Sequence, residues 1–153
     1  MVRVLFVCLG NICRSPMAEA IFTHHVAEAG LGDEVALDSA GTGSWHAGEE
    51  PHPGTRQALK RRGITFAHIA RAVTADDFVS QDHLVAMDAA NRADLLRLGC
   101  DPARVSMLLD YVPGMAGEDV PDPYYTGDFE HCYHLVDAGC RALLQRIRAH
   151  HAL

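Results

Sequence analysis

VRVLFVCLGNICRS, residues Val2–Ser15, has the pattern of a strand, a tight loop and the start of a helix. The apolar run Val4–Val7 predicts a short buried strand, and Ser15 followed by Pro16 predicts a helix with Ser15 as its N-cap. Gly10 and Asn11 tolerate the backbone angles that a tight loop requires. Because backbone N–H groups converge at a helix N-terminus, this loop is expected to bind an oxyanion.

Two side chains of the loop point to its chemistry: Cys8 at the strand end, and Arg14 after five intervening residues. A thiol that faces N–H groups at the positive end of a helix is expected to ionise to a nucleophilic thiolate. Arg14 carries a planar guanidinium that can hold two phosphoryl oxygens at once. The Ser15 hydroxyl is placed to donate to the thiolate. The loop therefore predicts attack of sulfur on a bound phosphoryl group.

The segment CLGNICRSPMAEA, Cys8–Ala20, closely resembles the phosphate-binding loop and first helix of the low-molecular-weight protein tyrosine phosphatases. The resemblance implies a four-stranded, doubly wound parallel sheet in the order 2-1-3-4. It also implies hydrolysis of phosphotyrosine and small aryl phosphates through a cysteinyl-phosphate intermediate, with phosphate or similar oxyanions as inhibitors. No metal and no organic cofactor is implied, since thiolate, arginine and acid suffice. The implied phosphate-binding loop consists of Cys8, Leu9, Gly10, Asn11, Ile12, Cys13, Arg14 and Ser15.

Length and composition favour one globular domain over residues 1–153, with 48% hydrophobic and 22% charged residues. A net charge of -7 argues against nucleic-acid and anionic-membrane partners. No apolar run approaches the roughly 20 residues that cross a bilayer. The opening MVRVLFV leads directly into the loop, so it is not interpreted as a signal peptide. A cytoplasmic location is expected, and secretion without a signal peptide stays open.

The cysteines show no disulfide framework, and a thiolate nucleophile favours a reducing cytoplasm. These five residues are Cys8, Cys13, Cys100, Cys132 and Cys140. Cys13 faces the same loop as Cys8, which leads to the hypothesis of a disulfide that protects Cys8 from over-oxidation. A zinc site has poor support, because the chain has neither a CxxC nor an HxxxH pair. The adjacent pairs His24-His25 and His150-His151 are interpreted as solvated surface.

Helical and strand-like segments alternate after the loop, which predicts a parallel sheet covered on both faces, with ligands at the carboxyl ends of its strands. Periodicity alone leaves the strand order open. The predicted helices are Pro16–Ala29, Pro53–Arg62, Asp88–Leu98 and a C-terminal helix capped by Asp128; the later strands are Val35–Ala40, Leu84–Met87 and Val105–Leu108. A long loop is expected between the last strand and Gly127.

The family resemblance implies a general acid in the segment PDPYY, residues 121–125. By resemblance, Asp122 protonates the leaving oxygen and then, as a carboxylate, activates water. Prolines on both sides of Asp122 stiffen the segment. Tyr124 and Tyr125 are expected to line the mouth of the site, and Trp45 its opposite wall.

Three further residues resemble supporting positions of the family. Ser39, in the segment DSAGT, is expected to hydrogen-bond Asn11, and His68 is expected to orient the same asparagine. Asp88, which follows Met87, is expected to hydrogen-bond near Arg14 or its loop.

Other activities share this fold. Protein arginine phosphatases carry threonine where this chain has Ile12, and an apolar side chain favours an aromatic ester over a guanidinium. Thiol-dependent arsenate reductases need resolving cysteines, whereas Cys132 and Cys140 fall on the apolar face of the last helix and are expected in the core. A phosphopeptide-binding module needs neither Cys8 nor Asp122. The expected partner is a phosphotyrosine-containing protein or peptide.

Overall fold

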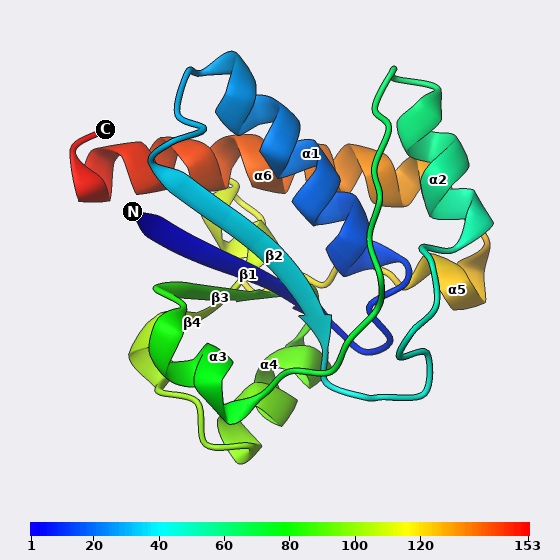
Figure 1. The fold of residues 1–153 in the computed structure, drawn as a ribbon, viewed down its shortest axis with the longest axis horizontal. Helices are drawn as coiled ribbons and strands as arrows, with labels where there is room; N and C mark the ends of the chain where they lie inside the picture. Colours follow the sequence, from blue (N-terminus) through cyan, green and yellow to red (C-terminus); the bar gives the residue numbers. More distant parts are fainter.

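A computed structural model describes all of residues 1–153 and contains one four-stranded sheet in the order β2-β1-β3-β4 (Figure 1). Every neighbouring pair of strands runs parallel. The strands are β1 (Val2–Cys8), β2 (Val35–Gly41), β3 (His83–Ala86) and β4 (Val105–Met107). The doubly wound α/β fold and the strand order that the resemblance implied are therefore confirmed.

Helices cover both faces of the sheet, as Figure 1 shows. The first and last long helices pack against each other on one face, and two shorter helices lie on the other. The helices are α1 (Arg14–Glu28), α2 (Pro53–Lys60), α3 (Ala75–Ser80), α4 (Ala89–Arg97), α5 (Pro123–Thr126) and α6 (Phe129–His151). Two 3₁₀ turns, η1 (Pro102–Arg104) and η2 (Leu108–Tyr111), flank β4. None of the helices combines the length and the apolar composition that crossing a bilayer requires.

Strand β1 is buried on both faces, which explains its continuous apolar run. Phe6 and Cys8 belong to the core under α1 and α6, whereas Leu5 and Val7 belong to a second core on the opposite face. Phe6 also meets the ring of Phe22 edge to face, with ring centroids 5.5 Å apart. Cys8 is thereby held at the carboxyl end of a strand that is packed from both sides.

Helix α1 begins earlier than the sequence predicted. Its first residue is Arg14, and the N-cap is Cys13, which makes no side-chain capping hydrogen bond. The expectation that Ser15 is the N-cap was therefore wrong. The hydroxyl of Ser15 is engaged instead with Cys8 and Asn11, inside the first turn of the helix.

Two short helices lie in segments for which the sequence analysis predicted no helix. Helix α3 has a capping box, in which the side chain of Thr74 and that of Asp77 each accept a backbone N–H of the other residue. Helix α5 lies inside the predicted long loop and is capped by Asp122, which accepts the N–H of Tyr124. Helices of six and four residues are too short to show an apolar period.

The interpretation of both histidine pairs as solvated surface was wrong for one member of each. His25 is 8% exposed and bonds through Nε2 to Asp137 Oδ1 at 2.7 Å, because α1 packs against α6 there. His151 is half-buried, and its Nε2 lies 3.0 Å from Nε2 of His83 at the start of β3. His24 and His150 are exposed.

Candidate active site

The carboxyl edge of the sheet brings together three segments that are far apart in the sequence. Cys8 ends β1, and Asp88 follows β3 as the N-cap of α4. The segment before α5 is fixed to the same edge, because the N–H of Val120 donates to the carbonyl of Met87 at 2.9 Å. This anchor places Asp122, two residues further on, beside the loop that follows Cys8.

The loop after β1 wraps around the sulfur of Cys8. The backbone N–H of Asn11 donates to Sγ of Cys8 at 3.3 Å, and Oγ of Ser15 lies 3.0 Å from the same sulfur. Asn11 has a φ of 57°, a left-handed conformation that few non-glycine residues adopt. This strained turn is what aims the Asn11 N–H inward, at the sulfur.

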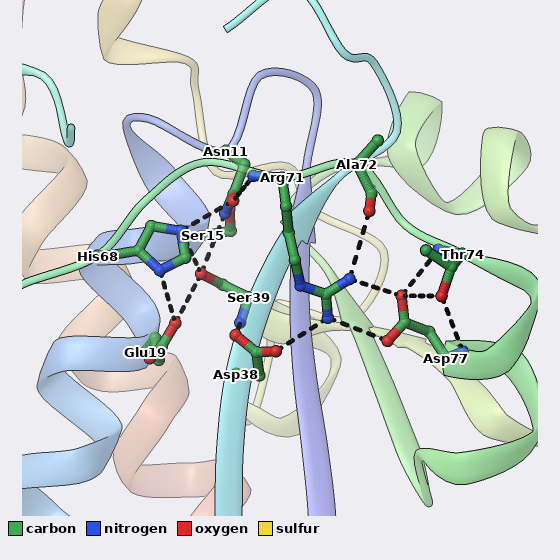
Figure 2. A network of polar contacts seen from close by, with 10 residues as sticks. All are labelled: Asn11, Ser15, Glu19, Asp38, Ser39, His68, Arg71, Ala72, Thr74 and Asp77. Carbon is green, nitrogen blue, oxygen red and sulfur yellow. Dashed lines mark hydrogen bonds and ion pairs between the residues drawn. The ribbon is translucent and has the colours of Figure 1, made fainter. Parts of the chain in front are cut away.

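The side chain of Asn11 stabilises this conformation through hydrogen bonds made by both its amide nitrogen and its amide oxygen (Figure 2). Its Nδ2 donates to Oγ of Ser15 at 2.8 Å and to Oγ of Ser39 at 3.0 Å. Its Oδ1 accepts from the backbone N–H of Arg71 at 3.0 Å and bonds Nε2 of His68 at 2.8 Å. The contacts expected of Ser39 and His68 are thus present. Every hydrogen-bonding position of this buried amide has a partner.

Glu19 completes this network from the next turn of α1, as Figure 2 shows. Its Oε1 accepts from Oγ of Ser39 at 2.7 Å and lies 3.5 Å from Nδ1 of His68. Burial raises the pKa of Glu19 to about 7 and lowers the pKa of His68. The sequence analysis missed Glu19, although its position four residues after Ser15 places both on one helix face.

Arg71 fixes the outer side of the network. Its guanidinium binds Asp38 Oδ2 at 2.9 Å and both carboxylate oxygens of Asp77 at 2.9 and 3.0 Å. The donor atoms of Glu19, Asp38 and His68 also lie close enough together to share a metal ion. They are already engaged with hydrogen-bond donors and acceptors of the protein, so we assign them to support of the loop.

Arg14 is 2% exposed and oriented from two sides. Its Nη1 donates to Oδ2 of Asp88 at 2.6 Å and to the carbonyl of Val120 at 2.9 Å. Burial opposes its charge, but Cys8, Asp88 and Asp122 outweigh that effect and raise the pKa of Arg14. The buried Nε–H has no acceptor within the protein. An oxyanion in the loop supplies one, so the arginine is arranged to complete its hydrogen bonds on a ligand.

A cleft of ≈ 240 Å³ opens above this loop. Ten residues line it: Cys8, Leu9, Gly10, Ile12, Cys13, Trp45, His46, Asp122, Tyr124 and Tyr125. Cys8 is 3% exposed at its base, whereas Trp45 is 73% and Tyr125 76% exposed at its rim. Asp122 faces into this cleft, where its Oδ2 lies 3.4 Å from Nη2 of Arg14. A nucleophile, an anion-binding loop, a carboxyl group and aromatic walls therefore meet at one place.

Known proteins are similar to this chain over nearly its whole length. The family model described as low molecular weight phosphotyrosine protein phosphatase matches residues 3–153. The chain belongs to this family. It is 48% identical, over 97% of both chains, to the low molecular weight protein-tyrosine-phosphatase YfkJ of Bacillus subtilis. The crystal structure of YfkJ superposes with a TM-score of 0.95 and covers 98% of this chain and 96% of that one.

A solved structure that is similar to this chain has a name that describes another substrate. The crystal structure of a Drosophila arginine phosphatase is 35% identical to this chain, with a TM-score of 0.88 over 95% of this chain and 97% of that one. The fold alone therefore does not separate phosphotyrosine from phosphoarginine as a substrate. The residues that line the cleft have to make that distinction.

One residue of the phosphatase cleft was not singled out from the sequence. His46 lines it beside Trp45, and its ring centroid lies 5.9 Å from that of Tyr124. Its Nδ1 is 2.7 Å from Oε2 of Glu49, which fixes the ring from the solvent side. The only indication in the sequence was that His46 follows Trp45 directly.

Cys13 is the only cysteine besides Cys8 that lines the phosphatase cleft. Burial, followed by the neighbouring Cys8, raises the pKa of Cys13 well above its usual range, so this thiol stays neutral. The remaining cysteines are buried elsewhere: Cys100 in the core beside α4, and Cys132 and Cys140 in the core beneath α6. The expectation that Cys132 and Cys140 belong to the core is confirmed.

Proposed function

We propose that this protein hydrolyses phosphotyrosine in proteins or peptides, and small aryl phosphates, through a cysteinyl-phosphate intermediate. The observation that carries the proposal is that Cys8 and Asp122 line one cleft with aromatic walls, while the buried guanidinium of Arg14 lies 3.4 Å from Asp122. Membership of a phosphotyrosine phosphatase family supports the same activity. The catalytic unit proposed is one domain over residues 1–153.

In the first step the Cys8 thiolate attacks phosphorus, and the bond from phosphorus to the tyrosine oxygen breaks. Inward-pointing N–H groups of the loop and the guanidinium of Arg14 stabilise the charge on the equatorial phosphoryl oxygens. Asp122 gives its proton to the departing phenolate oxygen. Phosphorus is then bound to sulfur, tyrosine leaves as a neutral phenol, and Asp122 is a carboxylate.

In the second step a water molecule attacks phosphorus from the side that the tyrosine has left. Asp122 takes the proton of this water, and the bond between sulfur and phosphorus breaks. The Ser15 hydroxyl, 3.0 Å from the sulfur, stabilises the thiolate as it departs. Inorganic phosphate leaves, and both Cys8 and Asp122 return to their starting protonation states.

The walls of the cleft favour an aromatic ester. Trp45, Tyr124 and Tyr125 present exposed rings at the rim, against which a substrate ring can pack. Ile12 adds an apolar side chain where a phosphoguanidinium group would leave its N–H groups unpaired. We therefore place phosphotyrosine ahead of phosphoarginine. Inorganic phosphate should bind the same loop and compete with the substrate.

A reducing compartment such as the cytoplasm suits this chemistry. All five cysteines are free and buried, and the proposed nucleophile acts only as a thiolate. The surface charge that accompanies the net value of -7 gives no reason to expect a nucleic-acid or anionic-membrane partner.

The deciding assay measures phosphate release from peptides that carry phosphotyrosine, phosphoserine or phosphoarginine, using wild type and Cys8→Ser. Turnover of phosphotyrosine alone, abolished in Cys8→Ser, is expected. Preference for phosphoarginine would contradict the argument from Ile12. Phosphate binding without turnover of any peptide would contradict the proposed hydrolysis and favour a binding module or arsenate reduction.

A further inference from the structure

A second cleft adjoins the phosphatase cleft on the side of α2. The two clefts share Ile12, His46 and Tyr124 as lining residues. The second cleft has a volume of ≈ 470 Å³, and we call it the linking cleft. Its position beside the phosphate-binding loop is fixed, because the N–H of His52, the N-cap of α2, donates to the carbonyl of Ile12 at 2.8 Å.

A third cleft, of ≈ 420 Å³, continues from the linking cleft along the side of α2, and we call it the α2 cleft. These two clefts share Pro51, Pro53 and Arg56. In Figure 1 α2 begins beside α5 and runs away from the loop after β1. A peptide whose phosphotyrosine occupies the phosphatase cleft can therefore continue through the linking cleft into the α2 cleft.

The α2 cleft combines apolar and basic side chains. Leu59 is buried and both Ile64 and Phe66 are half-buried, and these three supply its apolar surface. Arg56 and Lys60 are exposed and lie four residues apart, on one face of α2. No acidic residue lines this cleft, although the whole chain has a net charge of -7. The cleft is therefore a local basic site that suits a negatively charged side chain.

Both cations of the α2 cleft are free to bind a new partner. Lys60 forms no ion pair. Arg56 Nη1 lies 3.6 Å from Oε2 of Glu50, but the two side chains are 50% and 73% exposed, so this ion pair is weak. The two arginines that follow Lys60 differ, because each binds Glu130 at 2.6 Å.

We propose that Arg56 and Lys60 bind an acidic residue of the phosphoprotein substrate while its phosphotyrosine occupies the phosphatase cleft. This inference rests on the proposed function and adds a sequence preference to it. A carboxylate between the guanidinium and the ammonium would form two charge-assisted hydrogen bonds, and the stem of the acidic side chain would pack on the apolar part of the cleft.

The length of α2 sets the position of the acidic residue. The helix rises about 10 Å from Pro53 to Lys60, and an extended peptide covers this distance in about three residues. The acidic residue should therefore lie about three or four positions from the phosphotyrosine. Glu49 and Glu50 line the linking cleft, so an acidic residue only one or two positions away should gain no such advantage.

The test measures kcat/KM for a set of phosphotyrosine peptides at low ionic strength. Each peptide carries one glutamate, at one of the four positions before or the four positions after the phosphotyrosine, and is compared with the peptide that has glutamine there. For wild type, glutamate about three or four positions away on one side should raise kcat/KM about three- to tenfold, the effect of one or two exposed charge pairs. The gain should shrink as salt is added.

Lys60→Gln should lose most of this gain, and Lys60→Glu should prefer a peptide with lysine at the same position. Arg61→Gln is the matched control, because it removes a charge from the next residue, which is 63% exposed and faces Glu130. All three variants should hydrolyse p-nitrophenyl phosphate as wild type does, since this substrate does not reach the α2 cleft. That readout also shows that each variant is folded.

Lys60 is the only lysine of the chain, which allows contact with the substrate to be observed directly. A carbodiimide joins a carboxylate to an amine that it touches. In a Cys8→Ser background, which leaves the phosphate on the peptide, an acetylated peptide that carries the preferred glutamate should become linked to Lys60. Mass spectrometry identifies the linked residue, and Lys60→Gln should abolish the product.

Absence of turnover with every phosphotyrosine peptide would overturn the proposed function and this inference together. Turnover that does not depend on the position of the glutamate would overturn the α2 cleft alone, as would an equal loss of the gain in Lys60→Gln and Arg61→Gln. A cross-link confined to the chain's N-terminal amine would have the same meaning.

Discussion

Arg14 and Asp88 form a largely buried ion pair, with Nη1 of the arginine 2.6 Å from Oδ2 of the aspartate. The other carboxylate oxygen of Asp88 accepts the N–H of Asn91 at 2.7 Å, so the carboxylate is fixed on both sides. Asp88 and the carbonyl of Val120 together set the plane of the guanidinium. Arg14 can then present its remaining N–H groups to the cleft without rearrangement when substrate binds.

Asp88→Asn should lower kcat/KM for phosphotyrosine by about 10–100-fold, because the arginine loses its orienting charge while its own charge remains. Steady-state kinetics on a phosphotyrosine peptide measure the loss. Asp101→Asn is the matched control, since Asp101 only caps η1. An Asp88→Asn enzyme with the kinetics of wild type would show that Val120 alone orients the arginine.

Asp122→Asn should slow transfer of the phosphoryl group to Cys8 by about 10²–10⁴-fold for phosphotyrosine, whose phenolate needs a proton to leave. The effect should be much smaller for p-nitrophenyl phosphate, because p-nitrophenolate is stable without one. Rapid mixing that follows the first turnover separates this step from hydrolysis of the intermediate. The neighbouring Glu118→Gln, which alters an exposed carboxylate, is the control. Equal slowing with both substrates would argue against Asp122 as the general acid.

Asn11→Ala should lower the free energy of unfolding by about 2–4 kcal/mol. The buried polar groups that bond the Asn11 amide would lose their partner, and alanine would have to adopt the strained φ of 57°. Asn11→Gly loses the same hydrogen bonds but adopts that φ without a steric penalty. It should therefore be about 1 kcal/mol more stable than Asn11→Ala. Urea unfolding of both variants checks this order. A glycine variant no more stable than the alanine variant would mean that backbone strain contributes little.

The sequence predicted those parts of the site that are contiguous or rigidly spaced. Cys8, Asn11, Arg14 and Ser15 lie in one strand–loop–helix segment, so their spacing is visible in the sequence. The loop is nevertheless held in place by Ser39, His68 and Arg71, which come from other segments. Asp122 was assigned by resemblance to the family, and the prolines on both sides of it indicated only a stiff segment. The fold followed from the alternation of apolar segments, but the strand order came from resemblance rather than from periodicity.

Long-range packing produced the features that the sequence did not reveal. Glu19 acts through Ser39 and His68, which come from other segments, and no pattern in one segment marks such a contact. His25 and His151 are covered by α6 and β3, respectively, although an adjacent pair on a helix suggests exposure. Helices α3 and α5 depend on caps more than on an apolar period.

Asp77 makes the stability of the folded protein depend on pH in the acid range. It binds the guanidinium of Arg71, whose backbone N–H bonds Asn11 in the phosphate-binding loop. It is buried, which by itself raises its pKa, but hydrogen bonds from Arg71 and from the N–H of Thr74 outweigh burial and hold the pKa of Asp77 below 3.8. The folded state therefore binds this proton less tightly than the unfolded chain does. The resulting stabilisation is complete above pH 3.8 and is lost as the pH falls through the lower pKa of the folded state.

Asp77→Asn should reduce stability at pH 7 by about 2–3 kcal/mol and flatten the decline of stability below pH 4. Urea unfolding between pH 2.5 and pH 7 measures both effects, at about half-unit steps. Asp76→Asn changes the exposed neighbour in the same helix turn and should leave the curve as in wild type. If the free energy of unfolding of Asp77→Asn were lower than that of wild type by the same amount at every pH, protonation of Asp77 would not contribute to the loss of stability in acid.

Cys13 should determine whether oxidation of Cys8 is reversible. Peroxide converts the Cys8 thiolate to a sulfenic acid, and attack of the Cys13 sulfur on the oxidised sulfur would release water and form a disulfide. Both side chains line the cleft, and both are 3% exposed. The neutral Cys13 thiol must lose its proton during this attack, so the step should be slower than the initial oxidation of Cys8.

Wild type treated with peroxide should regain its activity in dithiothreitol, whereas Cys13→Ser should be inactivated irreversibly as its sulfenic acid advances to the sulfinic acid. Mass spectrometry of the peptide that contains Cys8 distinguishes the two products. Cys132→Ala removes a buried thiol that does not line the cleft and should recover as wild type does. Recovery of Cys13→Ser as complete as that of wild type would end the protective-disulfide hypothesis, because Cys8 would then need no partner.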